Sequence, residues 1–355
     1  MIGLLTIHDT INFGSQLQTY ALYKAVESLG CEIQLIDYQC QAIAERETTL
    51  PIKEAKNPKD VVKSILLHGS LEKRSQNFHK FMSENMKITK RYTKENIADA
   101  NQLFDCFLVG SDIVWGFNIT GNDYTYLLDF VKDAKKCAFS SSVGTRWDPS
   151  EDEKVKEHLT RFDRISVRET NASEWISELL NKKIDVTCDP TMLWGADFWK
   201  NVALSEMPEP KKRKPYVLVY MSDPENICVK KAIQYGKKHH LPVYYINYRA
   251  PVFGTTDKRP TSLSEWLDLF INAEIVFSAS YHGLLFSLYF HKRVFYFNWV
   301  NKSRMESLSK IFHIEDREGN DSNIEKDNPI DYAFIDRQIA MIQDDSWKIL
   351  KGMIL

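Results

Sequence analysis

Short apolar runs alternate with amphipathic segments along the first half of the chain. The apolar runs predict strands at residues 2–7, 32–36, 105–109, 136–141, 163–167 and 184–187. The amphipathic segments predict helices at residues 15–29, 149–160, 171–181 and, with a break at Gly69 and Ser70, 60–84. This alternation is typical of a mostly parallel, doubly wound sheet. The first half therefore predicts an α/β domain.

The same alternation restarts after a polar, proline-bearing stretch at residues 205–215, which predicts a linker. Strands are expected at residues 216–220, 243–246, 274–277 and 294–297, and helices at 225–239, 262–272, 282–290 and 302–312. We therefore expect two Rossmann-like α/β domains facing across a cleft, in a glycosyltransferase-B-like arrangement. Residues 1–205 form the first, with a C-terminal helix at 329–355 packing back onto it, and residues 206–328 form the second. Ligands in such folds bind at the carboxyl ends of strands.

Composition narrows the class of protein. A chain of 355 residues is longer than a single hydrophobic core usually supports, so two domains are expected. A content of 43% hydrophobic and 26% charged residues is typical of a soluble globular protein. The net charge of −2 does not favour a nucleic-acid partner. The six cysteines form no C-x-x-C pair, which indicates reduced thiols, and no metal-ligand spacing is present. Residues 1–7 lack the basic region of a signal peptide, and no run could span a bilayer, so a cytoplasmic protein is expected.

A histidine stands where the strand at residues 274–277 turns into an apolar helix. The local sequence is Ser278-Ala279-Ser280-Tyr281-His282-Gly283. A helix N-terminus favours an anion, and an imidazole beside an anion is a candidate general acid. The alternative is a histidine that merely bonds a neighbouring carbonyl. The two serine hydroxyls, which add hydrogen-bond donors, favour the anion site.

Polar residues also follow several other predicted strands. They include Asp9, Asp112, Arg168 and Asp189. Each alone could be an ordinary helix cap. Together they favour a polar cleft at one sheet edge. The loop from Asn12 through Gly14 lacks the glycine and lysine pattern of a nucleotide-binding loop.

Several motifs, in order along nearly the whole chain, resemble the polysaccharide pyruvyl transferase family. They are Thr6-Ile7-His8-Asp9 through Asn12-Phe13-Gly14-Ser15-Gln16, Val109-Gly110-Ser111-Asp112-Ile113-Val114-Trp115, Ser140-Ser141-Ser142-Val143-Gly144, Ile165-Ser166-Val167-Arg168-Glu169, Val186-Thr187-Cys188-Asp189-Pro190, Glu265-Trp266-Leu267 and Ser280-Tyr281-His282-Gly283. The resemblance implies transfer of pyruvate from phosphoenolpyruvate to a sugar of a surface-polysaccharide precursor. The implied product is a cyclic pyruvate ketal, and the implied acceptor is lipid-linked, with peripheral association at the inner membrane face.

The resemblance also implies roles for individual residues. His282 is the expected general acid, and Asp112 or Asp9 orients or deprotonates the acceptor hydroxyl. The donor is expected to contact Arg168, Arg304, Ser278, Ser280 and Gly283. The acceptor is expected to contact Asn12 and Gln16, with Trp115 stacking on a sugar ring. Neither a cofactor nor a metal is required.

One position departs from the family pattern. Many members carry an arginine two residues before the histidine, where this chain has Ser280. Another cation must then hold the donor, with Arg304 the first candidate and Arg249 and Lys302 the others. Two other functions remain open: a glycosyltransferase that uses a nucleotide sugar, and a non-catalytic sugar- or phosphate-binding protein.

Overall fold

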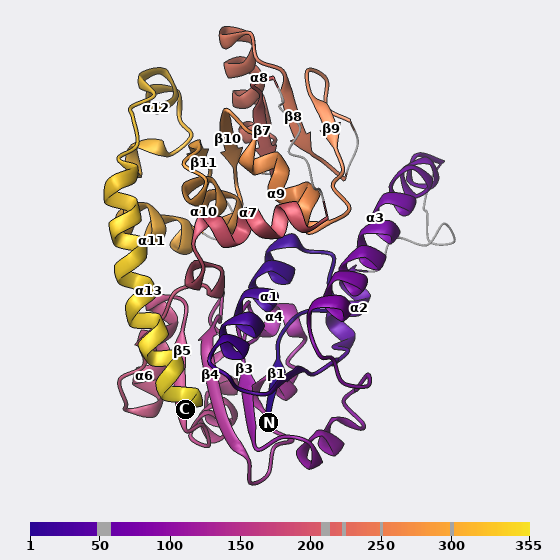
Figure 1. Cartoon of the computed structure of the whole chain (residues 1–355), viewed down its shortest axis with the longest axis vertical. Helices are drawn as coiled ribbons and strands as arrows, with labels where there is room; N and C mark the ends of the chain where they lie inside the picture. The colour runs from indigo at the N-terminus through magenta and orange to yellow at the C-terminus, as the bar shows by residue number, and fades with distance from the viewer. Residues whose placement is uncertain (48–57, 207–213, 222–224, 249–250, 299–301) are drawn as a thin grey trace. The chain divides into compact units, whose positions relative to one another are not determined.

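The computed structural model describes residues 1–47, 58–206, 214–221, 225–248, 251–298 and 302–355 (Figure 1). Within these ranges, the side chains of residues 59, 60, 62–68 and 302–304 are not described. Contacts divide the chain into two compact units. The first comprises Met1–Thr48, Phe78–Trp194 and Met341–Leu355, and the second comprises Thr49–Asn77 and Gly195–Ala340.

The first unit is built on a six-stranded, all-parallel sheet with the order β2-β1-β3-β4-β5-β6. Its elements are β1 (Ile2–Leu5), α1 (Phe13–Ser28), β2 (Ile33–Leu35), α2 (Gln41–Glu47), β3 (Cys106–Val109), α4 (Phe117–Thr120), β4 (Lys135–Ser141), α5 (Asp152–Leu159), β5 (Arg164–Val167), α6 (Thr170–Leu180), β6 (Asp185–Val186) and the short helix η5 (Pro190–Leu193).

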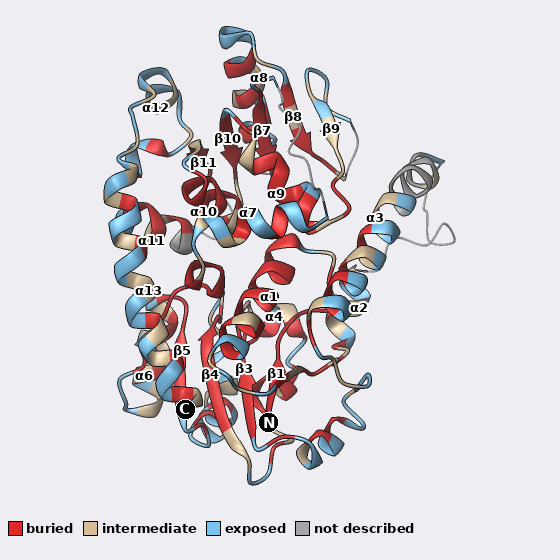
Figure 2. Cartoon of the chain, viewed as in Figure 1, coloured by how far each residue is buried: buried red, intermediate tan, exposed pale blue. Residues whose placement is uncertain are grey.

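Burial explains why this sheet forms. Every residue of β1 and of β3 is buried, as expected for strands covered on both faces by helices (Figure 2). The hydrophobic core of this unit includes Phe107 of β3 together with Trp115 and Tyr126. Because all six strands run parallel, their carboxyl ends share one edge. The polar residues that follow the strands are thereby gathered there.

The second unit has a five-stranded, all-parallel sheet with the order β11-β10-β7-β8-β9. Its elements are α7 (Ala196–Ser205), β7 (Val217–Tyr220), α8 (Ile227–His239), β8 (Val243–Ile246), β9 (Thr256–Lys258), α9 (Leu263–Ile271), β10 (Ile275–Ser278), α10 (Tyr281–Tyr289), β11 (Arg293–Tyr296), α11 (Lys302–Phe312) and α12 (Asp321–Lys326). The expected α/β class, with two Rossmann-like parallel sheets, is confirmed. The arrangement of two domains across a cleft stays a prediction.

The division between the units differs from the division expected at residue 205. Helix α7 belongs to the second unit, where the Ser264 hydroxyl donates to the Val202 carbonyl (3.0 Å) and Trp199 packs edge-on against Phe286. Helices α3 (Pro58–Asn85) and α13 (Tyr332–Ile354) each contribute residues to both units. In the first unit, the end of α13 is held by a hydrogen bond from the Cys188 amide to the Ser346 hydroxyl (3.0 Å).

Helix α3 runs without the break that was expected at Gly69 and Ser70. Among the described residues, no helix is both long and apolar enough to cross a membrane.

Candidate functional site

The turn from β10 into α10 is fixed by two serine hydroxyls. The Ser278 hydroxyl donates to the Tyr220 carbonyl (2.9 Å) and accepts from the Ser280 amide (3.1 Å). The Ser280 side chain caps α10 by accepting from the Gly283 amide (3.3 Å). Both hydroxyls therefore bond within the protein and position the first turn of α10. Their contact with a donor stays a prediction.

His282 lies in that first turn and is half-buried. Its ring meets the Tyr281 ring edge-on, with the centroids 5.3 Å apart, and its Nε2 atom is shielded from solvent. A titratable ring thus stands at a helix end that favours anions. Its role as general acid stays a prediction.

Gly283 allows α10 to pack closely against the sheet. A Cβ atom at this position would lie 2.2 Å from the Ser278 hydroxyl oxygen and 2.8 Å from Cδ1 of Tyr220. No other residue fits without displacing the turn. Gly283 therefore sets how closely the first turn of α10 approaches the sheet, and its contact with a donor stays a prediction.

Arg74 was missed by sequence reasoning. Although it lies on α3, it is only 5% exposed and belongs to the second unit. Its guanidinium lies over the Tyr248 ring, 4.0 Å from the centroid, in a cation–π contact. The sequence Glu72-Lys73-Arg74 predicts a solvated helix face and gives no signal of this burial.

Arg74 also acts on Tyr220, the residue that packs against Gly283. Burial raises the pKa of Tyr220 to about 12, and the Arg74 charge opposes that rise. Burial likewise raises the pKa of Tyr248, again against the Arg74 charge. A buried cation therefore lies within electrostatic reach of the side chains beside the α10 N-terminus.

Asp112 follows β3 at the carboxyl edge of the first unit's sheet. Its backbone is left-handed (φ 66°), a conformation that aspartate tolerates better than most residues. One carboxylate oxygen accepts from the Ser15 hydroxyl and the other from the Ile113 amide (2.9 Å). The half-buried carboxylate is thus held by neutral donors, at the start of α1.

Asp9 lies in a charged network at the ends of β1 and β2. Its Oδ1 atom is 3.4 Å from His79 Nε2, and its Oδ2 atom is 3.2 Å from Arg91. Arg91 also donates to Asp37 (3.1 Å), which lies 3.2 Å from His8 Nε2. Burial alone would raise the pKa of Asp37, but the hydrogen bonds from His8 and Arg91 prevail and lower the pKa to about 2.

Arg168 is buried between two carboxylates. Its Nη1 donates to Asp189 (2.7 Å) and its Nε to Glu169 (3.2 Å). Glu169 also accepts from the Ser142 hydroxyl (2.5 Å). The charge of the guanidinium is therefore balanced by carboxylates of the protein itself. This geometry favours a structural role for Arg168, in which it holds together the loops at the carboxyl edge of the sheet. Contact with a donor stays a prediction.

Two of the three residues predicted to contact the acceptor, Asn12 and Gln16, form hydrogen bonds within the protein, and their contact with a sugar stays a prediction. Asn12 is exposed and caps α1, accepting from the Gly14 amide (2.8 Å). Gln16 is 2% exposed. Its amide nitrogen donates to the backbone carbonyls of His8 (2.5 Å) and Thr10 (2.8 Å), and these hydrogen bonds fix the conformation of the β1–α1 loop.

The stacking role of Trp115 is corrected. The side chain is 1% exposed, donates to the Tyr126 carbonyl (2.9 Å) and packs edge-on against Phe162. A sugar ring has no access to its faces, so Trp115 is a core residue of the first unit.

Of the alternative donor cations, Arg249 and the side chains of Lys302 and Arg304 lie outside the described residues. The backbone of Arg304 forms part of α11. Within the described part of the chain, no group of three or more His, Cys, Asp and Glu side chains could hold a metal ion.

Several solved structures are similar to this chain over most of its length. The UDP-GlcNAc 2-epimerase from Neisseria meningitidis bound to UDP-GlcNAc is 10% identical, with a TM-score of 0.49 and coverage of 99% of this chain and 98% of that chain. The E. coli heptosyltransferase WaaC with ADP is 10% identical, with a TM-score of 0.39 and coverage of 84% and 87%. An alpha-glucosyltransferase in complex with UDP-glucose and DNA containing an abasic site is 10% identical, with a TM-score of 0.48 and coverage of 99% and 94%.

Sequence comparison is more specific. No curated protein matches the chain. The family model for polysaccharide pyruvyl transferase matches residues 12–301, which include the α1 cap, Asp112, Arg168 and the β10–α10 turn with His282. This match covers well over half of the 355 residues. The chain belongs to the polysaccharide pyruvyl transferase family.

Proposed function

We propose that this protein transfers pyruvate from phosphoenolpyruvate to two hydroxyls of one sugar in a polysaccharide or lipid-linked oligosaccharide precursor, forming a cyclic ketal and releasing phosphate. The observation that carries the proposal is the family match over residues 12–301. The position of His282 in the first turn of α10 supports it.

The reaction removes one proton from each of two hydroxyls and delivers one proton to the methylene carbon and one to the departing phosphate. The methylene carbon of phosphoenolpyruvate takes up a proton, which makes the second carbon electrophilic. A sugar hydroxyl adds to that carbon and loses its proton, and the C–O bond to phosphate breaks. A second hydroxyl then adds to the same carbon and loses its proton, closing the ketal. A general acid, a base and cations for two anionic groups meet these needs.

On the donor side, His282 is the acid, and the N-terminus of α10 helps to hold an anionic group. Arg74 supplies the missing cation in place of the arginine that many family members carry at position 280. Its burial and its stacking on Tyr248 support this role, because a preorganised guanidinium loses little freedom on binding a carboxylate or phosphate.

On the acceptor side, Asp112 is the better of the two candidate bases. Both oxygens of Asp9 are already engaged, one with His79 and the other with Arg91. Among the described residues, the Asp112 carboxylate accepts only from a hydroxyl and an amide, and a carboxylate has further lone pairs for a sugar hydroxyl.

The test is to incubate purified protein with phosphoenolpyruvate and a panel of lipid-linked and free oligosaccharides. We expect phosphate release that depends on acceptor, and an acceptor whose mass rises by pyruvic acid less one water. A nucleotide-sugar glycosyltransferase would instead release nucleotide from a nucleotide sugar and would leave phosphoenolpyruvate intact. A non-catalytic binding protein would release neither.

A further inference from the structure

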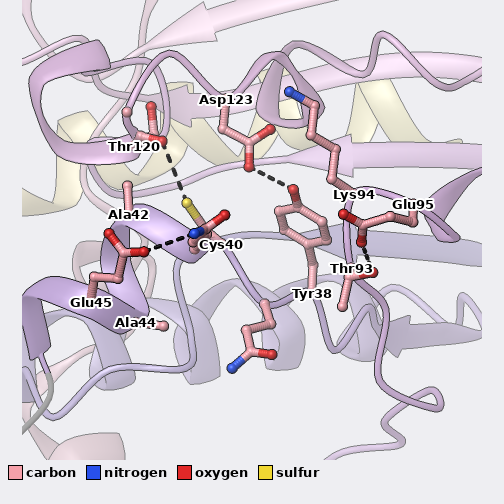
Figure 3. A pocket seen from close by; sticks show the side chains of 13 residues that line it. Tyr38, Cys40, Ala42, Ala44, Glu45, Thr93, Lys94, Glu95, Thr120 and Asp123 are labelled. Atoms are coloured by element: carbon pink, nitrogen blue, oxygen red, sulfur yellow. Dashed lines mark hydrogen bonds between the residues drawn. The ribbon is translucent and has the colours of Figure 1, made fainter.

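A pocket of about 550 Å³ opens in the first unit beyond the carboxyl end of β2 (Figure 3). Its walls come from four segments: residues 38–40 after β2, the start of α2, residues 93–95, and residues 120–123. The volume falls in the range of about 300–1,000 Å³ that is typical of small-molecule sites.

A rigid polar group forms one wall of the pocket. The Tyr38 hydroxyl donates to the Asp123 carboxylate (2.5 Å) and accepts from the Thr125 hydroxyl (3.1 Å). Asp123 also accepts from the Thr125 amide (3.0 Å). Tyr38 is 2% exposed, and its ring meets the Tyr126 ring edge-on. These contacts hold the wall in one conformation before any ligand arrives.

Other polar side chains in the lining are available to a ligand. The Gln39 side chain is half-buried and the Lys94 ammonium is exposed, and neither has a side-chain hydrogen bond or ion pair within the described part of the chain. The Gln41 amide, also in the lining, donates to Glu45 (2.8 Å). In Figure 3, Glu45 and Lys94 lie on opposite sides of Tyr38.

The charges in the lining select among ligands. Three carboxylates, those of Glu45, Glu95 and Asp123, line the pocket against the single ammonium of Lys94. An anion such as phosphoenolpyruvate would meet net repulsion there. A neutral molecule rich in hydroxyls can donate to carboxylates and accept from the Gln39 amide and Lys94.

The pocket adjoins one of the candidate catalytic aspartates. A much smaller hollow, lined by His8 and Asp9 among others, shares Tyr38, Cys40 and Ala44 with it. A ligand in the pocket therefore lies next to the residues that follow β1, on the sheet edge where Asp112 follows β3.

We propose that this pocket binds a neutral sugar residue of the acceptor, with the Gln39 amide and the Lys94 ammonium donating to its hydroxyl and ring oxygens. The identification of this sugar as part of the acceptor rests on the proposed function. The binding of a neutral sugar in the pocket does not depend on that function. The pocket thereby selects acceptors that present an uncharged residue beside the sugar that receives pyruvate.

The binding test needs no donor. Saturation-transfer NMR would measure the affinity of the full-length protein for the methyl glycosides of glucose, galactose and N-acetylglucosamine, with methyl glucuronide as the anionic comparator. We expect a neutral glycoside to bind more tightly than the glucuronide. Gln39→Ala and Lys94→Ala should each weaken that binding about threefold to tenfold, as for loss of one hydrogen bond. Lys132→Ala, at an exposed lysine outside the pocket, is the matched control and should bind as wild type.

The kinetic test separates the pocket from the reaction. In the ketal-forming assay, the two pocket variants should raise the acceptor KM about threefold to tenfold and leave the phosphoenolpyruvate KM unchanged. If wild type transfers no pyruvate but still binds a neutral glycoside through Gln39 and Lys94, the proposed function falls and the sugar pocket stands. Failure of wild type to bind any neutral glycoside, tighter binding of the glucuronide, or unchanged affinity in both variants would overturn the pocket proposal.

Discussion

Arg168 and Asp189, which follow the neighbouring strands β5 and β6, form an ion pair of 2.7 Å in which both side chains are almost completely buried. Glu169 shares the same guanidinium, and the Thr191 amide and hydroxyl donate to Asp189 (2.9 and 2.7 Å). The pair joins the carboxyl end of the sheet to η5. From the sequence, an arginine at the carboxyl end of a strand is expected to bind an anionic ligand. In the structure, its partners are carboxylates of the protein itself.

Replacing Arg168 should therefore affect folding before it affects donor binding. Arg168→Ala leaves two buried carboxylates without their cation, and we expect a loss of about 3–5 kcal/mol in the free energy of unfolding. Chemical denaturation measures this. Arg146→Ala, which breaks a more exposed pair with Asp152, is the control and should cost about 1 kcal/mol or less. A stable Arg168→Ala protein with a raised phosphoenolpyruvate KM would restore the clamp assignment.

Gly283→Ala tests the packing of α10 against the sheet. The added Cβ would overlap the Ser278 hydroxyl and crowd Tyr220. We expect a loss of about 1–3 kcal/mol in stability, seen as a lower Tm, together with reduced activity. Gly352→Ala, at an exposed helical glycine with nothing within 4 Å, should be neutral or stabilising by up to about 1 kcal/mol. Equal Tm values for wild type and Gly283→Ala would show that the turn has more space than the structure gives it.

Arg74→Gln tests the donor cation. Loss of a charge-assisted hydrogen bond should raise the phosphoenolpyruvate KM about tenfold or more, with the acceptor KM unchanged. Lys73→Gln, at the exposed neighbour on the same helix, should behave as wild type. A folded Arg74→Gln protein with an unaltered phosphoenolpyruvate KM would remove Arg74 from the donor site and return the role to Arg304, Arg249 or Lys302.

Asp37 should make stability depend on pH in the acid range. Its pKa in the folded protein, about 2, lies below the ordinary value of 3.8, so its contribution is complete above about pH 4 and is lost as the pH falls toward 2. The shift corresponds to about 2 kcal/mol. Denaturation of wild type and Asp37→Asn should show a stability difference at pH 5 that shrinks below pH 4. A difference that grows on acidification would contradict the assignment.

Local pattern predicted the strands well, because each buried strand is a short apolar run of its own. β10 and the turn into α10 follow directly from Ile275-Val276-Phe277 and the two serines. β9 was missed because it is a polar, partly exposed edge strand, Thr256-Asp257-Lys258. The expected break in α3 was wrong because a glycine costs a helix only about 1 kcal/mol, which neighbouring turns can offset.

The site was less predictable, because partners far apart in sequence decide what a polar residue does. The burial of Arg74 depends on Tyr248, and that of Arg168 on Asp189. The motif around Trp115 identifies the family, yet its indole belongs to the core. The position of His282 could be predicted, because a strand, a cap and a helix that are adjacent in sequence determine it.

The most direct measurement is the mass and NMR spectrum of the acceptor product formed in D2O. If His282 protonates the methylene carbon of phosphoenolpyruvate, the ketal methyl group should carry one non-exchangeable deuterium from solvent, and one phosphate should be released per ketal. His282→Ala should slow its formation about 10²–10⁴-fold. Transfer of a group other than pyruvate, a ketal methyl without solvent deuterium, or a His282→Ala rate equal to that of wild type would contradict the mechanism.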